Sequence, residues 1–404
     1  MPIAVLGAGV VGMTTAYYLA EAGHDVIVFD RAESVAAATS HANGAQLSYS
    51  YTDSLAQPGF MSRIPGLVMG FDPAIRVGRF GNEAMVPWGL SFMKQCTTER
   101  AKANTLAVLD IALESSRLLD EIRATLDIDF AWRRPGKLAI LSDAAEVESA
   151  REKARWKQER GCDVRVIDYE EALSLEPALA DMKQDFAGAV YSPDDEVGDA
   201  RAFSVGLADY LVANRGVELR LGESVEELLL EKGKLHAVRT ASGEIEADAV
   251  VVCLGPWTAP FLRPLGIPLP IYPIRGYSIT LPAAESAPSV SITNIGKRIV
   301  YSLLEGQVRI AGFADFLNLN TGRDKQRLQT LKRIAREVAP KAADYEAPEQ
   351  FEWGGFRPVT PDSRPIVGRT NTPGVYLNCG HGVLGWTLSC ATGKQVADEL
   401  VSSS

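Results

Sequence analysis

The 404-residue sequence has few of the residues that build metal centres and disulfide frameworks. It contains five cysteines and four histidines, no two cysteines are spaced C-x-x-C, and no histidine stands at metal-ligand spacing. We therefore expect no metal site. An odd number of scattered cysteines fits a reducing compartment, which predicts a cytoplasmic protein without a disulfide framework.

Long apolar runs and an excess of basic residues are also missing. No stretch of 18 or more apolar residues occurs, and no leader pattern precedes the first strand-like segment, so we expect neither a spanning helix nor a signal peptide. Any membrane contact would be peripheral, on an inner membrane. The 51 acidic and 41 basic residues give a net charge of −10, which argues against a nucleic-acid partner. The length allows two or three domains.

The first thirty residues show a βαβ pattern. The apolar segment Ile3–Leu6 predicts a buried strand, residues 10–22 predict a helix that ends at Gly23, and residues 25–29 predict a second strand. In this order, the elements are typical of a dinucleotide-binding unit.

Three glycines and one acid give this unit its chemistry. Gly7, Gly9 and Gly12 form G-x-G-x-x-G, which allows a sharp turn, a close approach of the backbone to a pyrophosphate, and tight packing of the helix on the sheet. Asp30 follows the second strand, where it can accept hydrogen bonds from a ribose but would repel a 2′-phosphate. NADP is therefore disfavoured, whereas NAD and FAD both remain.

A second glycine turn lies near the C-terminus. Residues 375–379 predict a strand, Gly380-His381-Gly382 a turn, and the following residues a helix that runs through Leu400. The N-terminus of that helix would favour an anion, such as the negative charge that a flavin gains along its N1/O2 edge on reduction. A packed turn without a ligand would explain the same residues, so both interpretations stay open here.

The nucleotide-binding pattern is interrupted along the chain. Residues 1–47, 163–262 and 354–404 predict one α/β body, and residues 48–162 and 263–353 predict a second domain with a mixed antiparallel sheet. Prolines at 264, 268, 270 and 273 mark a crossing between the two. We expect Gly354–Pro358 to begin a loop region.

Six motifs in order resemble the D-amino-acid oxidase family of FAD flavoproteins, most closely its bacterial D-amino acid dehydrogenases. The resemblance covers nearly the whole chain and implies a Rossmann-like FAD-binding domain interleaved with an α+β substrate-binding domain. The motifs are Gly7–Gly12 with Asp30, Thr39–Gly44, Gly255–Trp257, Pro273–Ser278, Arg357–Asp362 and Gly380–Trp386.

The resemblance also implies which residues contact FAD. No cysteine stands where sarcosine-oxidase relatives attach the flavin, so we expect a non-covalent cofactor. The loop Ala42–Ala45 and the residues after it depart from the family pattern, which leaves the substrate's size open. The implied contacts are Gly7, Gly9, Val10, Val11, Gly12, Asp30, Arg31, Ser40, Asn43, Gly44, Gln46, Val225, Gly255, Trp257, Gly355, Gly382, Leu384, Gly385, Trp386 and Thr387.

The implied reaction is oxidation of a D-amino acid at Cα to a 2-oxo acid and ammonia. A hydride passes to flavin N5, and the electrons go on to a quinone or another acceptor. Glycine or sarcosine oxidases and D-proline or D-hydroxyproline dehydrogenases are related alternatives. We assign no acid–base residue, because hydride transfer needs a neutral, well-placed amine and no obligatory base.

The substrate's carboxylate calls for an arginine, whose planar guanidinium binds it with two hydrogen bonds. We expect Arg357 in this role, although it would also suit a structural ion pair with Asp362. The remaining candidates, each of which would equally suit a packing role, are Tyr277, Arg275, Tyr49 and Tyr51. We expect His381 to shape its turn.

Overall fold

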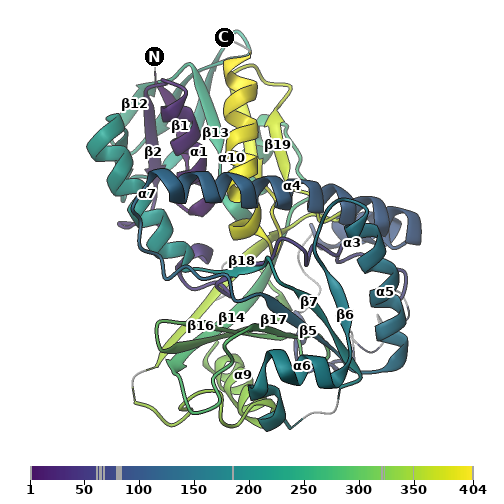
Figure 1. Ribbon diagram of the computed structural model, residues 1–404. Helices are drawn as coiled ribbons and strands as arrows, with labels where there is room; N and C mark the ends of the chain where they lie inside the picture. The colour runs from purple at the N-terminus through teal and green to yellow at the C-terminus, as the bar shows by residue number, and fades with distance from the viewer. Residues whose placement is uncertain are drawn as a thin grey trace.

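Two sheets dominate the molecule, one above the other in Figure 1, and the long helix α4 (Thr98–Thr125) runs across the region between them. This computed structural model describes residues 2–60, 62, 66, 69–78, 84–183, 186–319, 322, 324–348 and 350–402. The two chain ends lie close together at the top of the upper sheet.

The upper sheet has six strands in the order β19-β20-β13-β1-β2-β9. Its central strand, β1, pairs in parallel with β2 and β13, and the edge strand β19 runs antiparallel to β20. The strands are β1 (Ile3–Leu6), β2 (Val26–Asp30), β9 (Glu218–Leu221), β13 (Ala249–Val252), β19 (Ile366–Arg369) and β20 (Val375–Cys379).

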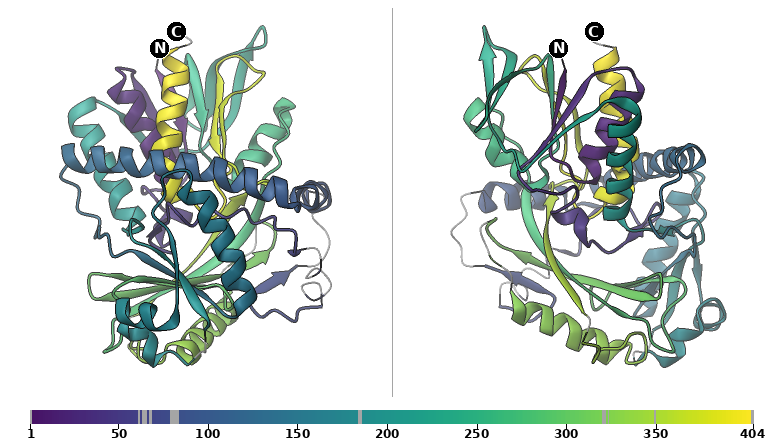
Figure 2. Two further views of the ribbon diagram at one scale, coloured as in Figure 1. Left: turned by 45° about the vertical axis from the view of Figure 1, so that its right-hand side comes forward. Right: turned by 90° about the vertical axis from the view of Figure 1, so that its left-hand side faces the viewer.

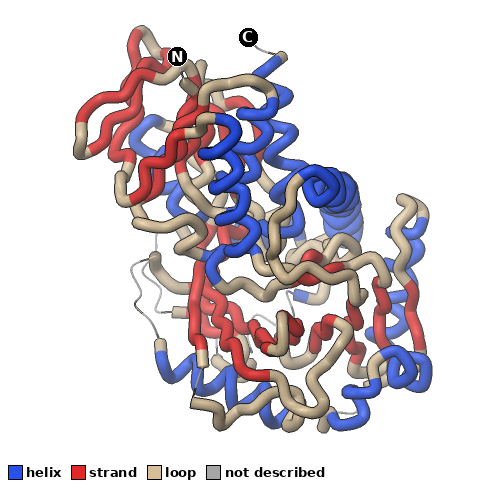
Figure 3. The backbone as a smooth tube through the Cα atoms, turned by 60° about the vertical axis from the view of Figure 1, so that its left-hand side comes forward, coloured by secondary structure: helices blue, strands red, loops and turns tan. Residues whose placement is uncertain are grey.

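Helices cover one face of this sheet and a small antiparallel sheet covers the other, as Figure 3 shows. Gly393 permits close packing of two helices, because a Cβ there would lie 3.0 Å from the backbone of Thr14. The helices are α1 (Val10–Glu21), α7 (Ala200–Arg215) and α10 (Gly385–Val401). The small sheet consists of β10 (Val225–Glu231), β11 (Lys234–Thr240) and β12 (Gly243–Glu246).

The lower sheet has nine strands, and helix α9 (Lys325–Val338) packs on its outer face, away from the upper sheet (Figure 2). The order is β18-β14-β17-β16-β15-β5-β7-β6, with β4 beside β17. The strands are β4 (Ile75–Val77), β5 (Lys137–Leu141), β6 (Arg165–Ile167), β7 (Gly188–Ser192), β14 (Tyr272–Pro282), β15 (Ser291–Asn294), β16 (Ile299–Leu304), β17 (Gln307–Phe316) and β18 (Phe351–Val359).

Shorter elements join the two sheets. The pair β3 (Gln46–Leu47) and β8 (Glu196–Val197) lies where the chain passes between them. The remaining α-helices of the described residues are α3 (Met85–Gln95), α5 (Ala144–Gln158), α6 (Tyr169–Leu175) and α8 (Thr258–Leu262).

The structure confirms the N-terminal βαβ unit and the C-terminal strand and helix, but the loop expected from Gly354–Pro358 is wrong. These residues lie inside β18, which pairs with β14 over nine residues. Two glycines and a proline lower the strand propensity of the segment, and the cross-strand pairing outweighs that.

The division of the chain into two domains stays a prediction. Strands β6 and β7, and β18 from residue 354 onward, belong to the lower sheet although they fall within ranges assigned to the FAD-binding domain. The physical reason is again pairing. β7 is antiparallel to both β5 and β6, so the chain that follows residue 163 first completes the lower sheet.

Candidate active site

A cavity of about 950 Å³ lies where the two sheets meet. Its walls come from the turn between β1 and α1, the ends of β2 and β13, and the loop that leads into β3. The lower sheet contributes residues of β14, β17 and β18, and the turn before α10 closes the wall. Segments more than 300 positions apart in the sequence therefore share one space.

At one end the wall is mostly backbone. Gly7 has a φ of +108°, and a Cβ at Gly12 would lie 1.7 Å from the carbonyl oxygen of Gly7, so both positions require glycine. The helix α1 that starts here has no side-chain cap at Gly9. Its Val10 N–H donates to Ser40 Oγ at 3.1 Å, within the cavity lining.

Asp30 lies at the same end, at the tip of β2. Its carboxylate accepts hydrogen bonds from the backbone N–H groups of Ala8 and Ala32, at 2.7 and 2.8 Å. A carboxylate has about four acceptor positions, so Asp30 keeps two for hydroxyl donors such as those of a ribose.

The N-terminus of α10 opens into the same cavity. Gly380 and Gly382 both have positive φ values, and helix α10 begins without a side-chain cap. Burial lowers the pKa of His381 to about 3, and its Nε2 lies 3.0 Å from Thr392 Oγ1. His381 is therefore neutral and holds the turn in place, as the sequence predicts.

Arg357 lies at the lower-sheet side of the cavity, on β18. Its Nη1 donates to the carbonyl oxygen of Phe313 at 2.7 Å, and in the described part of the chain the guanidinium forms no ion pair. Burial lowers the pKa of Arg357 to about 10, so the side chain still carries its charge at neutral pH. The alternative pair with Asp362 does not form, because that carboxylate accepts from the backbone N–H of Arg364.

Glycine on the neighbouring strand makes room for this guanidinium. A Cβ at Gly276 would lie 2.3 Å from Arg357 Nη2. Gly276 faces Gly355 in the register of β14 and β18, so no side chain from either position fills the space. In the motif Arg275–Ser278, it is therefore Gly276 that leaves the space occupied by the guanidinium of Arg357.

Tyr277 lines the cavity with its ring, while its hydroxyl is already engaged. The hydroxyl donates to Asp315 Oδ2 at 2.9 Å, and that fully buried carboxylate also pairs with Arg76 at 2.8 Å and Arg327 at 2.7 Å. The proton that we expected Tyr277 to offer a substrate is therefore committed to Asp315.

Two expected substrate residues lie outside the lining. Tyr49 is buried in the core and donates to Glu196 Oε2 at 2.9 Å, whereas Tyr51 does line the cavity. The guanidinium of Arg275 lies over the rings of Tyr277 and Phe356 and bonds to the carbonyl of Gly322. The register of β14 against β17 shifts between Arg275 and Tyr277, so regular strand alternation does not relate these two residues.

The expected cofactor residues are brought together, with two exceptions. Gly12 lies behind the turn against Gly7, and Thr387 lies behind the α10 turn, where its Oγ1 accepts from Ser48 N at 3.0 Å. Those that line the cavity are Gly7, Gly9, Val10, Val11, Asp30, Arg31, Ser40, Asn43, Gly44, Gln46, Val225, Gly255, Trp257, Gly355, Gly382, Leu384, Gly385 and Trp386.

Lys137 lines the cavity and was missed at the level of sequence. It is buried on β5, where its Nζ donates to Gln46 Oε1 at 3.0 Å and Ser48 Oγ at 2.7 Å and lies 4.3 Å from the centre of the Tyr51 ring. Burial lowers the pKa of Lys137 to about 8. A single lysine before an apolar strand is a weak signal, since most such lysines point to solvent.

The geometry fits a dinucleotide whose reactive half carries negative charge. The N-termini of two helices face one cavity, which suits a diphosphate at the first and an anionic ring edge at the second. A half-buried arginine without an ion-pair partner among the described residues adds a place for a small carboxylate. These features define a flavin-dependent class of enzyme.

Comparison with known proteins gives the family. The family model described as FAD-dependent oxidoreductase, DAO, matches residues 2–399. D-amino acid dehydrogenase 2 of Ralstonia nicotianae is 39% identical over 407 residues, covering 98% of this chain and 96% of that protein. A D-amino acid dehydrogenase of Chromohalobacter salexigens is 34% identical, covering 98% and 95%. The chain belongs to the DAO family of FAD-dependent oxidoreductases, and its cofactor is FAD.

Solved structures agree on the fold. Glycine oxidase from Bacillus cereus superimposes with a TM-score of 0.75 at 21% identity, covering 100% of this chain and 95% of that one. L-proline dehydrogenase from P. horikoshii gives 0.74 at 19%, covering 100% and 93%. The described helices include none that is both long and apolar enough to cross a bilayer.

Proposed function

We propose that this protein oxidises D-amino acids at Cα to 2-oxo acids and ammonia and passes the electrons to a quinone or a similar carrier. The observation that carries the proposal is Arg357, a half-buried cation without an ion-pair partner among the described residues, beside the FAD cavity of a chain 39% identical to a D-amino acid dehydrogenase. When bound, FAD accepts a hydride from the substrate at N5.

Arg357 would hold the substrate's carboxylate through two charge-assisted hydrogen bonds. Its anchoring bond to the Phe313 carbonyl uses Nη1, and the glycines beside it leave the guanidinium accessible from the cavity. A guanidinium held in this way fixes the carboxylate, and with it the direction of the Cα–H bond.

The same cavity would favour a neutral substrate amine. Arg357 and Lys137 both place positive charge on the lining, and neither forms an ion pair among the described residues. A nearby positive charge lowers the pKa of an ammonium group, so the substrate loses a proton more readily on entry. The resulting lone pair on nitrogen supports hydride loss at Cα, and water then hydrolyses the imine to the 2-oxo acid and ammonia.

The N-terminus of α10 would stabilise the reduced cofactor. Residues 382–386 line the cavity, and α10 begins there without a side-chain cap, which leaves the first N–H groups of the helix without a capping side chain. Donors fixed in this way favour a developing negative charge without having to reorganise.

We also propose that FAD is held without a covalent bond. Cys253 and Cys379 line the cavity, and burial raises the pKa of both thiols, that of Cys253 to about 12. Buried thiols of high pKa stay protonated and are poor nucleophiles. Acid precipitation should release all the yellow colour into the supernatant, whereas colour retained by the pellet would contradict the proposal.

The substrate class is tested by flavin bleaching near 450 nm in the absence of oxygen. D-alanine should reduce the flavin, and L-alanine at the same concentration is the matched control. D-proline, sarcosine and L-proline test the related imino-acid and amine oxidoreductases. If D-alanine leaves the flavin oxidised while sarcosine or proline bleaches it, the enzyme acts on secondary amines, and if no amine bleaches it, the proposal fails.

A further inference from the structure

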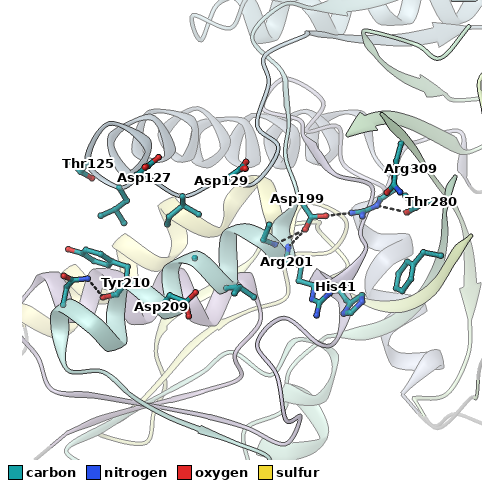
Figure 4. A pocket seen from close by; sticks show the side chains of 18 residues that line it. His41, Thr125, Asp127, Asp129, Asp199, Arg201, Asp209, Tyr210, Thr280 and Arg309 are labelled. Atoms are coloured by element: carbon teal, nitrogen blue, oxygen red, sulfur yellow. Dashed lines mark hydrogen bonds and ion pairs between the residues drawn. The ribbon is translucent and has the colours of Figure 1, made fainter. Parts of the chain in front are cut away.

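A second hollow, with a volume of about 1010 Å³, lies beside the FAD cavity. One wall is helix α7 and the other is the segment that follows α4, and Figure 4 shows the side chains that line the hollow. At its inner end lie His41, Phe351 and Arg309. We refer to it as the α7 groove.

A stack of aromatic rings separates the α7 groove from the FAD cavity. The ring of His41 lies parallel to that of Trp353, with centroids 4.5 Å apart and planes 21° apart. Phe351 stacks on His41 at 5.3 Å. His41 and Phe351 line the groove, and Trp353 lines the cavity, so one pair of stacked rings spans the wall between the two spaces.

The inner end of the groove has the chemistry to hold a flat, electron-poor ring. Phe351 is 42% exposed and offers a ring face. Arg309 is fixed there by Asp199 at 3.1 Å and by Thr280 Oγ1 at 3.1 Å, and Asp199 lies between Arg309 and Arg201 (Figure 4). Flat rings stack on aromatic faces, and arginines stabilise negative charge on an oxygen atom.

We propose that the α7 groove binds the head group of a quinone, which takes electrons from reduced FAD across the Trp353–His41 stack. This proposal rests on the proposed function, because it assigns a place to the electron acceptor. The quinone takes two electrons from the reduced cofactor and two protons from water in the groove and becomes the quinol. The anionic reduced cofactor gives up the same two electrons and releases its one N5 proton to solvent.

The test uses a substitution that fills the α7 groove and does not alter the lining of the FAD cavity. Val205 lines the groove and is 38% exposed, and Val212, on the same helix but outside the groove lining, is 51% exposed. We compare Val205→Trp with Val212→Trp. FAD is reduced with dithionite without oxygen and mixed with ubiquinone-1, and the return of absorbance near 450 nm is followed by stopped flow.

Val205→Trp should slow reoxidation by about tenfold or more at low quinone concentration, the effect of losing one stacking contact. Val212→Trp should match the unmodified enzyme. A second pair of variants makes the test independent of how the new tryptophan side chain packs. Phe351→Ala removes the ring face and should slow reoxidation too, whereas Phe71→Ala, at a residue 74% exposed and outside the groove lining, should not.

Unchanged reoxidation in Val205→Trp and Phe351→Ala would overturn the proposal, as would an unmodified enzyme that ubiquinone-1 does not reoxidise. Chemical reduction keeps this outcome separate from that of the proposed function. A protein that no D-amino acid reduces, but whose dithionite-reduced FAD is reoxidised through the groove, would refute the substrate class and support the acceptor site.

Discussion

The two ends of the FAD cavity are built in different ways. At the α1 end, the wall consists of glycine turns and backbone N–H groups that are neighbours in the sequence. At the lower-sheet end, it consists of charged side chains brought together by strand pairing, with Arg357 on β18 and Lys137 on β5. The comparison teaches that, under the proposed function, the nucleotide would be held by local backbone geometry and the substrate by side chains from distant strands.

The two ends also differ in charge. Near α1 the donors are neutral amides and the carboxylate of Asp30 carries two hydrogen bonds from the backbone. At the lower sheet, the described residues leave two cations without an ion-pair partner, the buried Lys137 and the half-buried Arg357, and burial lowers the pKa of each. A buried cation without a partner costs stability, which is consistent with a position kept for binding an anion.

The largest effect is expected at the backbone-built end, from Gly12→Ala. A Cβ 1.7 Å from the Gly7 carbonyl oxygen has no space, so the turn before α1 must open. We expect a colourless protein that binds no FAD, measured as the ratio of absorbance at 450 nm to that at 280 nm. Gly89→Ala is the control, because nothing lies within 4 Å of that added Cβ in helix α3. Normal FAD content in Gly12→Ala would show that the turn does not set the cofactor site.

Arg357→Ala should weaken substrate binding at the lower-sheet end of the cavity and leave FAD binding at the α1 end unchanged. Charge-assisted hydrogen bonds contribute about 1.5–3 kcal/mol, so KM for D-alanine should rise by roughly 10- to 150-fold, with FAD content unchanged. Arg357→Lys keeps the charge but loses the planar fork, and should recover part of the loss. Arg275→Lys, at a residue outside the cavity lining, is the control. An unchanged KM in Arg357→Ala would mean that the arginine is structural.

The same comparison explains what the sequence could predict. The βαβ unit, the glycine turn before α10 and Asp30 were predictable because each depends on residues close together in the chain. A sequence motif was enough to propose Arg357 as a binding residue, whereas the cavity beside it could be found only in the structure.

Side-chain direction at the lower-sheet end of the cavity could not be read from the sequence. Tyr49 and Tyr51 are two residues apart, yet one donates to Glu196 in the core and the other lines the cavity. Lys137 gave no signal, because its partners Gln46 and Ser48 lie about 90 positions earlier. Such positions depend on strand register, which pairing over long sequence distances determines.

The buried lysine should show itself in the pH dependence of stability. Burial lowers the pKa of Lys137 to about 8, against an ordinary value near 10.4 in the unfolded chain. Between these values the unfolded chain binds more protons, so the free energy of unfolding should rise with pH by up to about 1.4 kcal/mol per unit. Lys137→Met should lack this rise, measured by urea unfolding at pH 7.5 and 9.5. Equal pH dependence in both proteins would place the titration elsewhere.

The smallest effect separates the two tyrosines. Tyr49→Phe removes the hydrogen bond to Glu196, and the free energy of unfolding should fall by about 1 kcal/mol while KM stays unchanged. Tyr51→Phe is the matched variant at the cavity, where the ring that faces Lys137 is kept and only the hydroxyl is lost. We expect a change in KM of about two- to twelvefold with little loss of stability, since one hydrogen bond contributes about 0.5–1.5 kcal/mol. An equal rise of KM in Tyr49→Phe and Tyr51→Phe would contradict this expectation. The buried Tyr49 would then matter for substrate binding as much as the cavity-lining Tyr51.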